Sequence, residues 1–540
     1  MVIHERKFKQ SGPFAQDFVD DFSKVAAFFS YDVKQETTFE KRKTFIEQRT
    51  YHREALVETL VRFNEKYNGT EKVRSNIEKL RRNDALVVVG GQQAGVLTGP
   101  ALVIYKAISI LRLAKEQEEK LGVPVIPVFW IAGEDHDFDE VNHIFLSKEQ
   151  EIVKHSLEHL YNNRQAVSTL LLPKEKMVDY IDEALFSYGE REYTKELREM
   201  LLQATDQSVT YTDFFAHLMM HLFGEHGLVL LDANDPHIRA LERGFFREII
   251  EKNESLHEAV YKKLEMMERM GYPLPFEKKR DQANLFMFLN GERYLLERVD
   301  GAFQLKNTDI RWSKEQLLDK LETEPALFSN NVVTRPLMQE YVLPTLAFIG
   351  GPGEIHYWGT LKEAFEVFSF EMPPVCMRLS YSIIERHIAK WMEELQITEE
   401  LLAEKNIQHQ KDAFISSVQS VETETTLNDL QQAIQKSKEQ LQQVGGEVDP
   451  TLIPFIEHAS QKMWREAEGI KRRIKQQELR QHEQVIQKYH AIEKSLLPQN
   501  IYQERFWSIW YYINAYGLDL VDRLVHVPVT FDELHKIVYV

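Results

Sequence analysis

The sequence is poor in cysteine and has no long apolar stretch. Cys376 is the only cysteine among 540 residues, which excludes an intrachain disulfide and any zinc site built from several cysteines. No run approaches about 18 consecutive apolar residues, and the segment 1–10 is too charged to begin a signal peptide. We therefore expect a cytoplasmic protein that neither spans a membrane nor carries a secretory leader.

Basic residues are also scarce relative to acidic ones. Lys and Arg together number 66 against 84 Asp and Glu, which gives a formal charge of −18. This acidity argues against a large surface for nucleic acid or for an anionic membrane. The chain is 43% hydrophobic and 11% aromatic. This balance indicates a globular protein, and the length predicts about two to four domains.

What the sequence does contain is a repeated strand-and-helix pattern. A β-branched run at 85–89 ends in two glycines, a helix follows from Pro100, and a second apolar run occupies 125–131. This order favours a parallel sheet. Similar runs at 227–232 and 344–349 continue the pattern, so we expect an α/β fold.

Two stretches interrupt this pattern and are expected to be inserts. The periodicity of 151–225 is mostly helical. Residues 284–306 alternate as hairpins do, with turns at Asn290-Gly291 and Asp300-Gly301.

The composition changes between about 383 and 498, where Gln, Glu and Lys dominate and no strand is predicted. Apolar residues recur there every seven positions on both sides of a break at Gly445-Gly446. The repeat consists of Leu427, Ile434 and Leu441 before the break and of Met463 and Ile470 after it. This pattern is typical of an antiparallel coiled coil. An arm of about 45 residues would extend roughly 70 Å, beyond any compact core, so we expect it to form a homodimer.

Two strand-end loops hold most of the residues suited to chemistry. Loop 90–99 is rich in glycine, which allows a ligand to approach the backbone closely, and loop 130–143 contains five acids and two histidines. Because neighbouring parallel strands end at one edge of a sheet, we expect the two loops to meet where α/β proteins bind ligands. The helix from Pro100 would aim its N-terminal amides at the same place.

His136 is the best candidate for acid–base or electrostatic chemistry, because it lies between Asp135 and Asp137. We expect these carboxylates to raise the pKa of the imidazole, so that it acts as a proton donor or charge stabiliser near neutral pH. The same acids could instead hold Mg²⁺ or form a solvated turn. Loop 90–99 matches neither a Walker A loop nor Gly-x-Gly-x-x-Gly, so it also fits a tight strand–helix turn.

Two further features are expected to be structural. His217 and His221 are four residues apart on a helix, but they lack a His-Glu-x-x-His motif and a thiolate partner, so packing is favoured over a zinc site. Cys376 follows an apolar run on an expected strand, where a buried cysteine usually packs rather than reacts.

Five segments identify a known family when they are read together. They are Gly-Gly-Gln-Gln-Ala-Gly-Val-Leu-Thr-Gly-Pro at 90–100, Pro-Val-Phe-Trp-Ile-Ala-Gly-Glu-Asp-His-Asp-Phe-Asp-Glu-Val-Asn-His at 127–143, Phe-Ile-Gly-Gly-Pro-Gly-Glu at 348–354, Arg-Leu-Ser at 378–380 and Leu-Pro-Gln-Asn-Ile-Tyr-Gln-Glu-Arg at 497–505. In this order they resemble the bacillithiol biosynthesis cysteine-adding enzyme (bacillithiol synthase) family, over essentially the whole chain.

The resemblance implies a Rossmann-type core like that of class I aminoacyl-tRNA synthetases, with connective inserts and a coiled-coil domain used for dimerisation. On this basis we divide the chain into 1–150, the first part of the core; 151–225, a helical connective insert; 226–255, core; 256–325, a second connective insert; 326–382, core; 383–498, the helical coiled coil; and 499–540, a return to the core.

The resemblance also implies a ligase that joins the carboxyl of cysteine to the amine of glucosaminyl malate, the last step of bacillithiol biosynthesis. Amide formation from a free carboxylate is uphill in water, so activation by ATP with Mg²⁺ is expected, and no zinc. An acyl phosphate and an acyl adenylate both stay open as intermediates. The sequence lacks the His-Ile-Gly-His and Lys-Met-Ser-Lys-Ser signatures by which class I synthetases bind ATP.

Residue roles are assigned by chemistry. The catalytic candidates are His136, Asp135 and Asp137. The substrate-binding candidates are Gln92, Gln93, Gly95, Thr98, Lys106, Asn142 and Trp358. The nucleotide-binding candidates are Arg378, Asn500, Gln503 and Arg505, where the core is expected to pass into and out of the coiled coil. A hinge clamped by ion pairs is the alternative for this last group, and the nucleotide could instead bind at the strand ends.

Two other classes of function fit parts of the sequence. A nucleotide-binding coiled-coil scaffold would sense a ligand with its core and recruit partners through its arm. A nucleotidyl transferase of the class I synthetase type would act on another small acid. The cluster at 134–137 favours chemistry over sensing, and the negative charge disfavours a tRNA partner.

Overall fold

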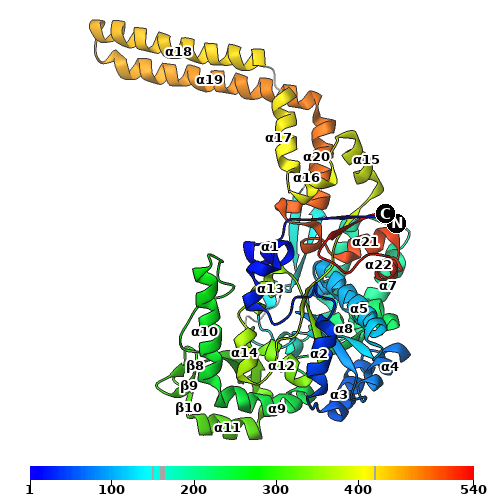
Figure 1. Ribbon diagram of the computed structural model, residues 1–540. Helices are drawn as coiled ribbons and strands as arrows, with labels where there is room; N and C mark the ends of the chain where they lie inside the picture. Colours follow the sequence, from blue (N-terminus) through cyan, green and yellow to red (C-terminus); the bar gives the residue numbers. More distant parts are fainter. Residues whose placement is uncertain (149–150, 159–163, 419–420) are drawn as a thin grey trace. The chain divides into compact units, whose positions relative to one another are not determined.

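The computed structural model describes residues 1–148, 151–158, 164–418 and 421–540 (Figure 1). Their contacts divide the chain into two compact units. The core unit comprises Ile3–Ser382 and Glu504–Ile537, and the arm unit comprises Met1–Val2, Ile383–Gln503 and Val538–Val540. The boundaries of the seven segments expected from the sequence stay predictions.

A five-stranded parallel sheet forms the centre of the core unit, in the order β13-β12-β2-β3-β6. Its strands are β2 (Leu86–Gln92), β3 (Val125–Ile131), β6 (Val229–Asp232), β12 (Thr345–Gly350) and β13 (Val375–Met377). All except β2 are buried along their whole length, as expected for a parallel sheet that is covered on both faces. This confirms the predicted α/β fold with a Rossmann-type sheet.

The strand order determines where a ligand can bind. Strands β3 and β6 follow on one side of β2, whereas β12 and β13 lie on its other side. The connections therefore leave β2 and β12 in opposite directions, which opens a crevice beyond their carboxyl ends.

The turn after β2 has an unusual backbone. It contains η3 (Val96–Thr98), in which Leu97 and Thr98 have φ of 47° and 58°, and it ends at Gly99 with φ of 68°. Left-handed backbone is costly for residues other than glycine, and such strain gathers at functional sites. Helix α5 (Leu102–Leu121) then crosses to β3 and is buried along most of its length.

The stretch after β3 begins with a hairpin and continues as helices. Strands β4 (His143–Lys148) and β5 (Glu151–Ser156) pair antiparallel, and they precede α6 (Lys174–Tyr188), α7 (Thr194–Gln207) and α8 (Tyr211–Phe223). The start of the region expected to be mostly helical is therefore a strand.

A second sheet is antiparallel and has the order β10-β9-β8-β7-β11. Its strands are β7 (Gln282–Leu289), β8 (Glu292–Val299), β9 (Ala302–Leu305), β10 (Arg311–Trp312) and β11 (Phe328–Asn330). Asn290 and Gly291 have φ of 52° and 82° in the turn between β7 and β8, and Asp300 and Gly301 have φ of 50° and 77° in the next turn. Positive φ at both central residues suits a tight hairpin turn, so the predicted hairpins are confirmed.

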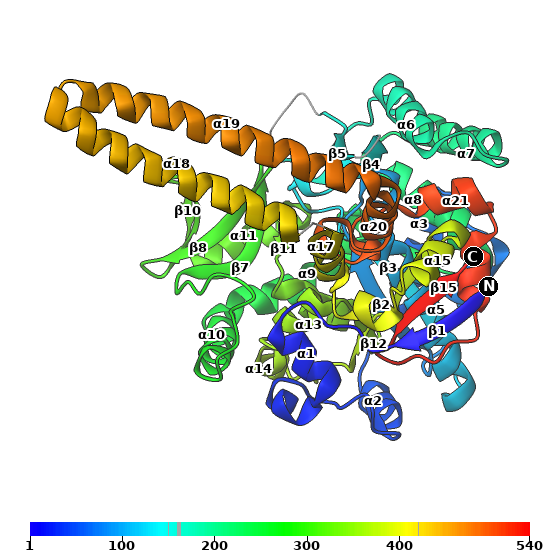
Figure 2. The same cartoon turned by 90° about the horizontal axis from the view of Figure 1, so that it is seen from above.

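The other helices of the core unit surround these sheets (Figure 2). They are α1 (Pro13–Asp20), α2 (Thr38–Glu47), α3 (Arg53–Glu65), α4 (Glu71–Lys79), α9 (Pro236–Glu251), α10 (Asn253–Arg269), α11 (Lys314–Thr323), α12 (Thr334–Val342), α13 (Pro352–Trp358), α14 (Lys362–Val367), α21 (Ile509–Tyr516) and α22 (Leu520–His526). The remaining strands are β1 (Val2–Arg6), β14 (Ser380–Ile384) and β15 (His535–Tyr539). Within the described ranges, no helix has both the length and the hydropathy needed to cross a membrane.

The arm unit consists mainly of helices. They are α15 (Arg386–Glu394), α16 (Glu399–Ala403), α17 (Ile407–Val418), α18 (Val421–Val448), α19 (Leu452–Gln481) and α20 (Glu483–Leu496). Helices α18 and α19 run side by side in opposite directions (Figures 1 and 2), which confirms the predicted antiparallel coiled coil. They have 28 and 30 residues and are shorter than expected, because a new helix starts at Glu483.

The glycine pair in the arm has a different role from the one expected. Helix α18 continues through Gly445 and Gly446 to Val448 instead of breaking there. A Cβ atom on Gly445 would lie only 2.5 Å from Ile456 Cδ1 of α19. The missing side chain therefore lets the two helices approach each other closely near their turn.

Candidate active site

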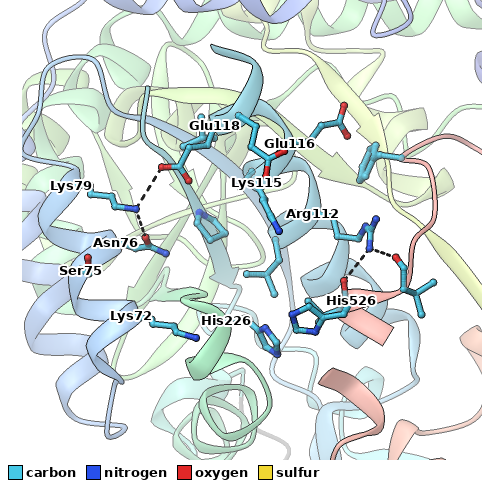
Figure 3. Close-up of a pocket in the computed structure, with 18 of the residues that line it drawn as sticks. Lys72, Ser75, Asn76, Lys79, Arg112, Lys115, Glu116, Glu118, His226 and His526 are labelled. Atoms are coloured by element: carbon cyan, nitrogen blue, oxygen red, sulfur yellow. Dashed lines mark hydrogen bonds and ion pairs between the residues drawn. The ribbon is translucent and has the colours of Figure 1, made fainter. Parts of the chain in front are cut away.

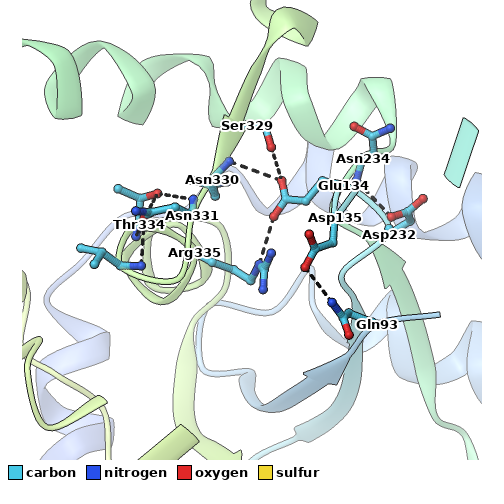
Figure 4. Close-up of polar contacts among 12 residues, drawn as sticks. Gln93, Glu134, Asp135, Asp232, Asn234, Ser329, Asn330, Asn331, Thr334 and Arg335 are labelled. Carbon is cyan, nitrogen blue, oxygen red and sulfur yellow. Dashed lines mark hydrogen bonds and ion pairs between the residues drawn. The ribbon is translucent and has the colours of Figure 1, made fainter. Parts of the chain in front are cut away.

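The two strand-end loops contact each other at the carboxyl edge of the parallel sheet. Ala132 N donates to Gln92 O at 2.9 Å. Gln93 Nε2 donates to Asp135 Oδ2 at 2.8 Å, a bond drawn in Figure 4, and to Glu140 Oε2 at 3.1 Å. The expected meeting of the loops is therefore confirmed.

A cavity of about 710 Å³ opens at this edge and lies entirely within the core unit. We call it the strand-end cavity. The two loops contribute Gln92, Gln93, Asp135 and His136 to its lining. Its cationic lining residues are Lys106, Arg293, Arg335, Arg378 and Arg505.

A second cavity, of about 870 Å³, lies at the other end of the sheet, near Val125 at the start of β3 (Figure 3). Two of its cations, Arg112 and Lys79, already have partners in the protein. Arg112 donates to the carbonyl oxygens of Val525 and Val529 at 3.0 and 2.7 Å, and Lys79 lies 3.6 Å from Glu118. None of the candidate residues from the sequence lines it, so the strand-end cavity is the candidate active site.

His136 has a different electrostatic environment from the one expected. Arg293 Nη1, on β8, lies 3.2 Å from His136 Nδ1 and 3.3 Å from Asp135 Oδ1. His136 Nδ1 and Asp135 Oδ1 are 3.6 Å apart. Burial and the charge of Arg293 lower the pKa of His136. The expectation of a raised pKa is wrong, because desolvation and this cation outweigh the neighbouring carboxylates.

The contact with Arg293 also indicates which nitrogen of His136 carries the proton. A guanidinium can only donate, so Nδ1 accepts the hydrogen bond and the neutral imidazole keeps its proton on Nε2. His136 is thereby suited to donate a hydrogen bond. Asp137 follows it with an exposed side chain just before η4 (Phe138–Glu140).

Glu134 anchors this loop from below the cavity and is fully buried. Its carboxylate pairs with Arg239 of α9 and with Arg335, whose Nε lies 3.0 Å from Oε1, and it accepts from Ser329 Oγ at 3.1 Å (Figure 4). Burial alone would raise the pKa of Glu134, but the nearby arginines outweigh this effect and hold it at about 2. The carboxylate is therefore ionised near neutral pH and fixes Arg335 beside the cavity.

The hydrogen bonds of the five cations show which of them can still bind a ligand. Lys106 Nζ donates to Gly91 O, Gln92 Oε1 and Glu354 Oε2 at 2.7, 2.9 and 2.5 Å. These bonds use all three N–H groups of the ammonium. Lys106 therefore connects the carboxyl end of β2 to α13.

Arg378 and Arg293 are engaged in a similar way. Arg378 forms a bidentate ion pair with Glu504, with N–O distances of 2.9 and 2.6 Å. Arg293 donates to Ser329 Oγ at 3.0 Å and to Asn330 O at 2.5 Å, in addition to its contacts with Asp135 and His136.

Arg335 and Arg505 differ from the other three. Arg335 uses only its Nε, on Glu134, and Arg505 forms no hydrogen bond or ion pair within the described part of the chain. Their free N–H groups line the strand-end cavity. These two guanidiniums are therefore available to anionic groups of a ligand.

A smaller cavity of about 270 Å³ adjoins the strand-end cavity, and we call it the side cavity. Gly95 and Thr98 line it, together with Gln92 and Gln93, which face both cavities. Asn142 lines neither cavity, and its Nδ2 donates to Asp139 Oδ1 at 3.2 Å.

Trp358 was expected to form a wall of the site, but its side chain is only 1% exposed. Its ring stacks on Phe348 at 4.2 Å and lies 5.9 Å from Phe365. Phe348 is the ring that lines the strand-end cavity. Trp358 therefore packs behind the site because its helix, α13, turns that face towards the sheet.

The four nucleotide-binding candidates are divided between the two units. Arg378 and Arg505 belong to the core unit and line the strand-end cavity with His136. Asn500 and Gln503 belong to the arm unit. The amide of Gln503 accepts from Ile383 N at 2.7 Å and donates to Ile383 O at 2.9 Å, so both its ends are occupied.

The histidines and the cysteine that we expected to be structural have local packing partners. His217 lies edge-on to Tyr67 with ring centroids 5.1 Å apart. Cys376 lies in strand β13, where burial raises the pKa of its thiol well above the usual range. Among the described residues, no three His, Cys, Asp or Glu side chains are grouped as metal ligands.

The sequence-based reasoning missed Arg293, Arg335 and Glu354. Arg293 follows the Asn290-Gly291 turn on an alternating strand, and an arginine at a position of that strand that is buried was the available signal. Nothing local distinguishes Arg335, which is placed by Glu134 from a distant part of the chain.

Comparison with known proteins identifies the family of the chain over essentially its full length. Residues 1–379 match the family model "Bacillithiol biosynthesis BshC, N-terminal Rossmann-like domain", and residues 381–540 match the model of its C-terminal coiled-coil domain. Relatives described as "Putative cysteine ligase BshC" include one from Bacillus licheniformis and one from Geobacillus kaustophilus, each 37% identical over all of both chains. Another, from Anoxybacillus flavithermus, is 38% identical over 93% of this chain and 94% of the relative. The chain therefore belongs to the bacillithiol biosynthesis BshC family.

Proposed function

We propose that this protein is a ligase that joins the carboxyl group of cysteine to the amine of glucosaminyl malate, at the expense of ATP. Family membership and the description of its relatives as cysteine ligases support the amino acid. The observation that carries the proposal is the strand-end cavity, in which Arg335 and Arg505 hold free guanidinium donors beside His136. The reaction brings together a malate group and a nucleotide phosphate, and both are anionic.

The proposed role of His136 is to donate a hydrogen bond from Nε2 to the oxygen that gains negative charge when the amine attacks the activated carboxyl group. A positioned donor of this kind stabilises the transition state more than the ground state. Arg293 and Asp135 hold the imidazole in place, through contacts at 3.2 and 3.6 Å.

The nucleotide is proposed to bind through Arg505 and Arg335, because guanidinium groups without protein partners suit phosphate oxygens. Mg²⁺ would arrive with the nucleotide. Arg378 supports this wall through Glu504, which immediately precedes Arg505 in the chain. Lys106 is proposed to shape the floor of the site, since its ammonium has no donor left for a carboxylate.

The arm unit is proposed to pair with a second copy of the chain, in the cytoplasm. Apolar side chains remain exposed on α18 and α19, and those of Leu441, Val444, Phe455 and Ile470 are 50%, 59%, 70% and 49% exposed. Burying such a surface against an identical arm would remove it from water.

Incubation of the purified protein with cysteine, glucosaminyl malate and Mg²⁺-ATP tests the proposed reaction. Mass spectrometry should detect bacillithiol, and the accompanying ADP or AMP distinguishes an acyl phosphate from an acyl adenylate. Omitting each substrate in turn provides the controls. Absence of the amide product, with nucleotide binding intact, would favour the scaffold hypothesis.

A further inference from the structure

The side cavity has the size of a site for one small molecule. Its volume is about 270 Å³, below the roughly 300 Å³ at which sites for drug-sized ligands begin. It shares Gln92, Gln93, Leu102, Glu140 and Arg505 with the strand-end cavity, so the two communicate. A nucleotide or a sugar conjugate is too large for it, whereas an amino acid is not.

The charged groups of the side cavity match the two charges of an amino acid. Glu140 accepts one hydrogen bond, from Gln93 at 3.1 Å, and has no cationic partner within the described residues. Arg505 is likewise without an acidic partner there. One unpaired carboxylate and one unpaired guanidinium therefore face the same small space, which suits an ammonium and a carboxylate on one molecule.

The third titratable group on this cavity adds no charge near neutral pH. His143 Nδ1 lies 3.2 Å from Asn142 Oδ1, an arrangement in which the ring nitrogen donates to the amide oxygen. Burial and the charge of Lys154 lower the pKa of His143. The imidazole is therefore neutral, and Glu140 and Arg505 determine the charge pattern.

One end of the side cavity is apolar. Phe145 and Phe506 stack with ring centroids 4.0 Å apart and an angle of 23° between the rings. Val141 and Ile144 complete this end and are almost fully buried. Aromatic rings attract sulfur more than they attract a hydroxyl group, which would lose its hydrogen bonds to water here.

We propose that the side cavity is the cysteine subsite, with the ammonium on Glu140, the carboxylate on Arg505 and the thiol against Phe145 and Phe506. Arg505 lines both cavities and has several N–H groups, so one of them can hold this carboxylate while another holds a phosphate oxygen of the nucleotide. This assignment rests on the proposed cysteine-ligase function. It places the carboxylate at the opening to the strand-end cavity, where the nucleotide activates it and the acceptor amine reaches it. It also keeps the amino group of cysteine protonated, so that this group does not compete as a nucleophile.

Three ligands and two variants of the full chain test the subsite. Glu140→Gln removes the proposed partner of the ammonium, and Asp139→Asn is the matched control, since it removes a neighbouring charge outside the cavity. The ligands are L-cysteine, 3-mercaptopropionate, which lacks the ammonium, and L-serine, which lacks the sulfur. Binding is measured by calorimetry under reducing conditions, with and without Mg²⁺-ADP, and the KM for cysteine is measured on the same preparations.

The wild-type protein should bind cysteine more tightly than either analogue. Glu140→Gln should weaken cysteine binding, or raise its KM, by roughly 10- to 100-fold, as expected for the loss of a charged hydrogen-bonding partner. It should leave the affinity for 3-mercaptopropionate unchanged, and Asp139→Asn should alter neither.

Three results would overturn the subsite in distinguishable ways. If wild-type protein forms the amide product but Glu140→Gln has the same KM for cysteine as Asp139→Asn, the subsite is wrong and the ligase function stands. If wild-type protein neither binds cysteine nor forms product, the subsite and the function fail together. An equal loss of cysteine and 3-mercaptopropionate binding in Glu140→Gln would also refute the pairing with the ammonium.

Discussion

At the scale of single residues, Arg293 determines how His136 can act. The two side chains are 157 positions apart in the sequence, and their contact places a fixed positive charge beside the imidazole. The sequence predicted a proton-donating His136 between two carboxylates. In the folded protein His136 is instead a neutral hydrogen-bond donor. This difference leads to separate predictions for the two residues.

His136→Asn should lower turnover by roughly 10²- to 10³-fold, the usual cost of losing one transition-state donor. The asparagine amide takes the place of Nδ1, so the contact with Arg293 can persist while the Nε2–H group is lost. His136→Gln, which reaches further, is the control and should retain more activity. Both variants should melt near the wild-type temperature, and a lower melting temperature with normal activity per folded molecule would make His136 structural.

Arg293→Gln should raise the pKa of His136 towards its ordinary value of about 6.5, because a nearby positive charge is removed. In the role proposed for His136 the neutral imidazole is the active form, so we expect activity to be lost as the pH falls through this pKa. The acid limb of kcat/KM should therefore move to higher pH in Arg293→Gln and stay in place in Arg293→Lys, which keeps the charge. An NMR titration, with the resonance assigned from its absence in His136→Asn, measures the pKa directly, and an unchanged value would refute the argument.

Arg505→Ala should weaken the binding of Mg²⁺-ADP without changing the affinity for glucosaminyl malate. The reason is that its guanidinium has no protein partner, so the variant loses only contacts to ligands, namely the nucleotide phosphate and the carboxylate of cysteine in the proposed subsite. Calorimetry on Arg505→Ala and Gln93→Ala measures the affinity for the nucleotide and shows whether it contacts Arg505 or loop 90–99. Unchanged nucleotide affinity in Arg505→Ala, together with its loss in Gln93→Ala, would place the nucleotide on the loop 90–99 instead.

At the scale of elements, local patterns predicted the strands and turns but not how they meet. The buried runs that became β2 and β3 were recognisable because parallel strands are apolar on both faces. The turn at Asn290-Gly291 was recognisable because few residues accept positive φ. The approach of β8 and α12 to loop 130–143 depends on packing between distant segments, so Arg293 and Arg335 could not be placed in the candidate site from the sequence.

Replacing residues 390–495 with a short linker should convert a dimer into a monomer. The exposed apolar side chains on α18 and α19 are the physical reason, because they would be covered only by a second arm. Light scattering measures the mass of both proteins in solution. A milder variant, Ile470→Lys, places a charge on the same surface without removing the helices, and it should weaken the dimer. An undiminished dimer in the deletion variant would show that another surface mediates association.

At the scale of the whole molecule, the scarcity of cysteine bears on metal content. The chain has one cysteine, and that residue is buried in β13. We predict that the purified protein holds no stoichiometric zinc and that its activity depends on Mg²⁺ through the nucleotide. Elemental analysis combined with titration of Mg²⁺ in the activity assay checks both statements. Stoichiometric zinc that disappears in His221→Ala would contradict the prediction.

The buried ion pairs around Glu134 also affect how the chain is made. Glu134 leaves the ribosome well before its partners Arg239 and Arg335, which follow it by 105 and 201 residues. Until both arrive, the nascent chain must keep this carboxylate hydrated, since a buried charge without a partner is costly. The core unit cannot bury Glu134 in loop 130–143 until most of this unit has been synthesised. Fragments truncated before Arg335 should therefore stay incompletely folded and require chaperones, even though they contain both strand-end loops.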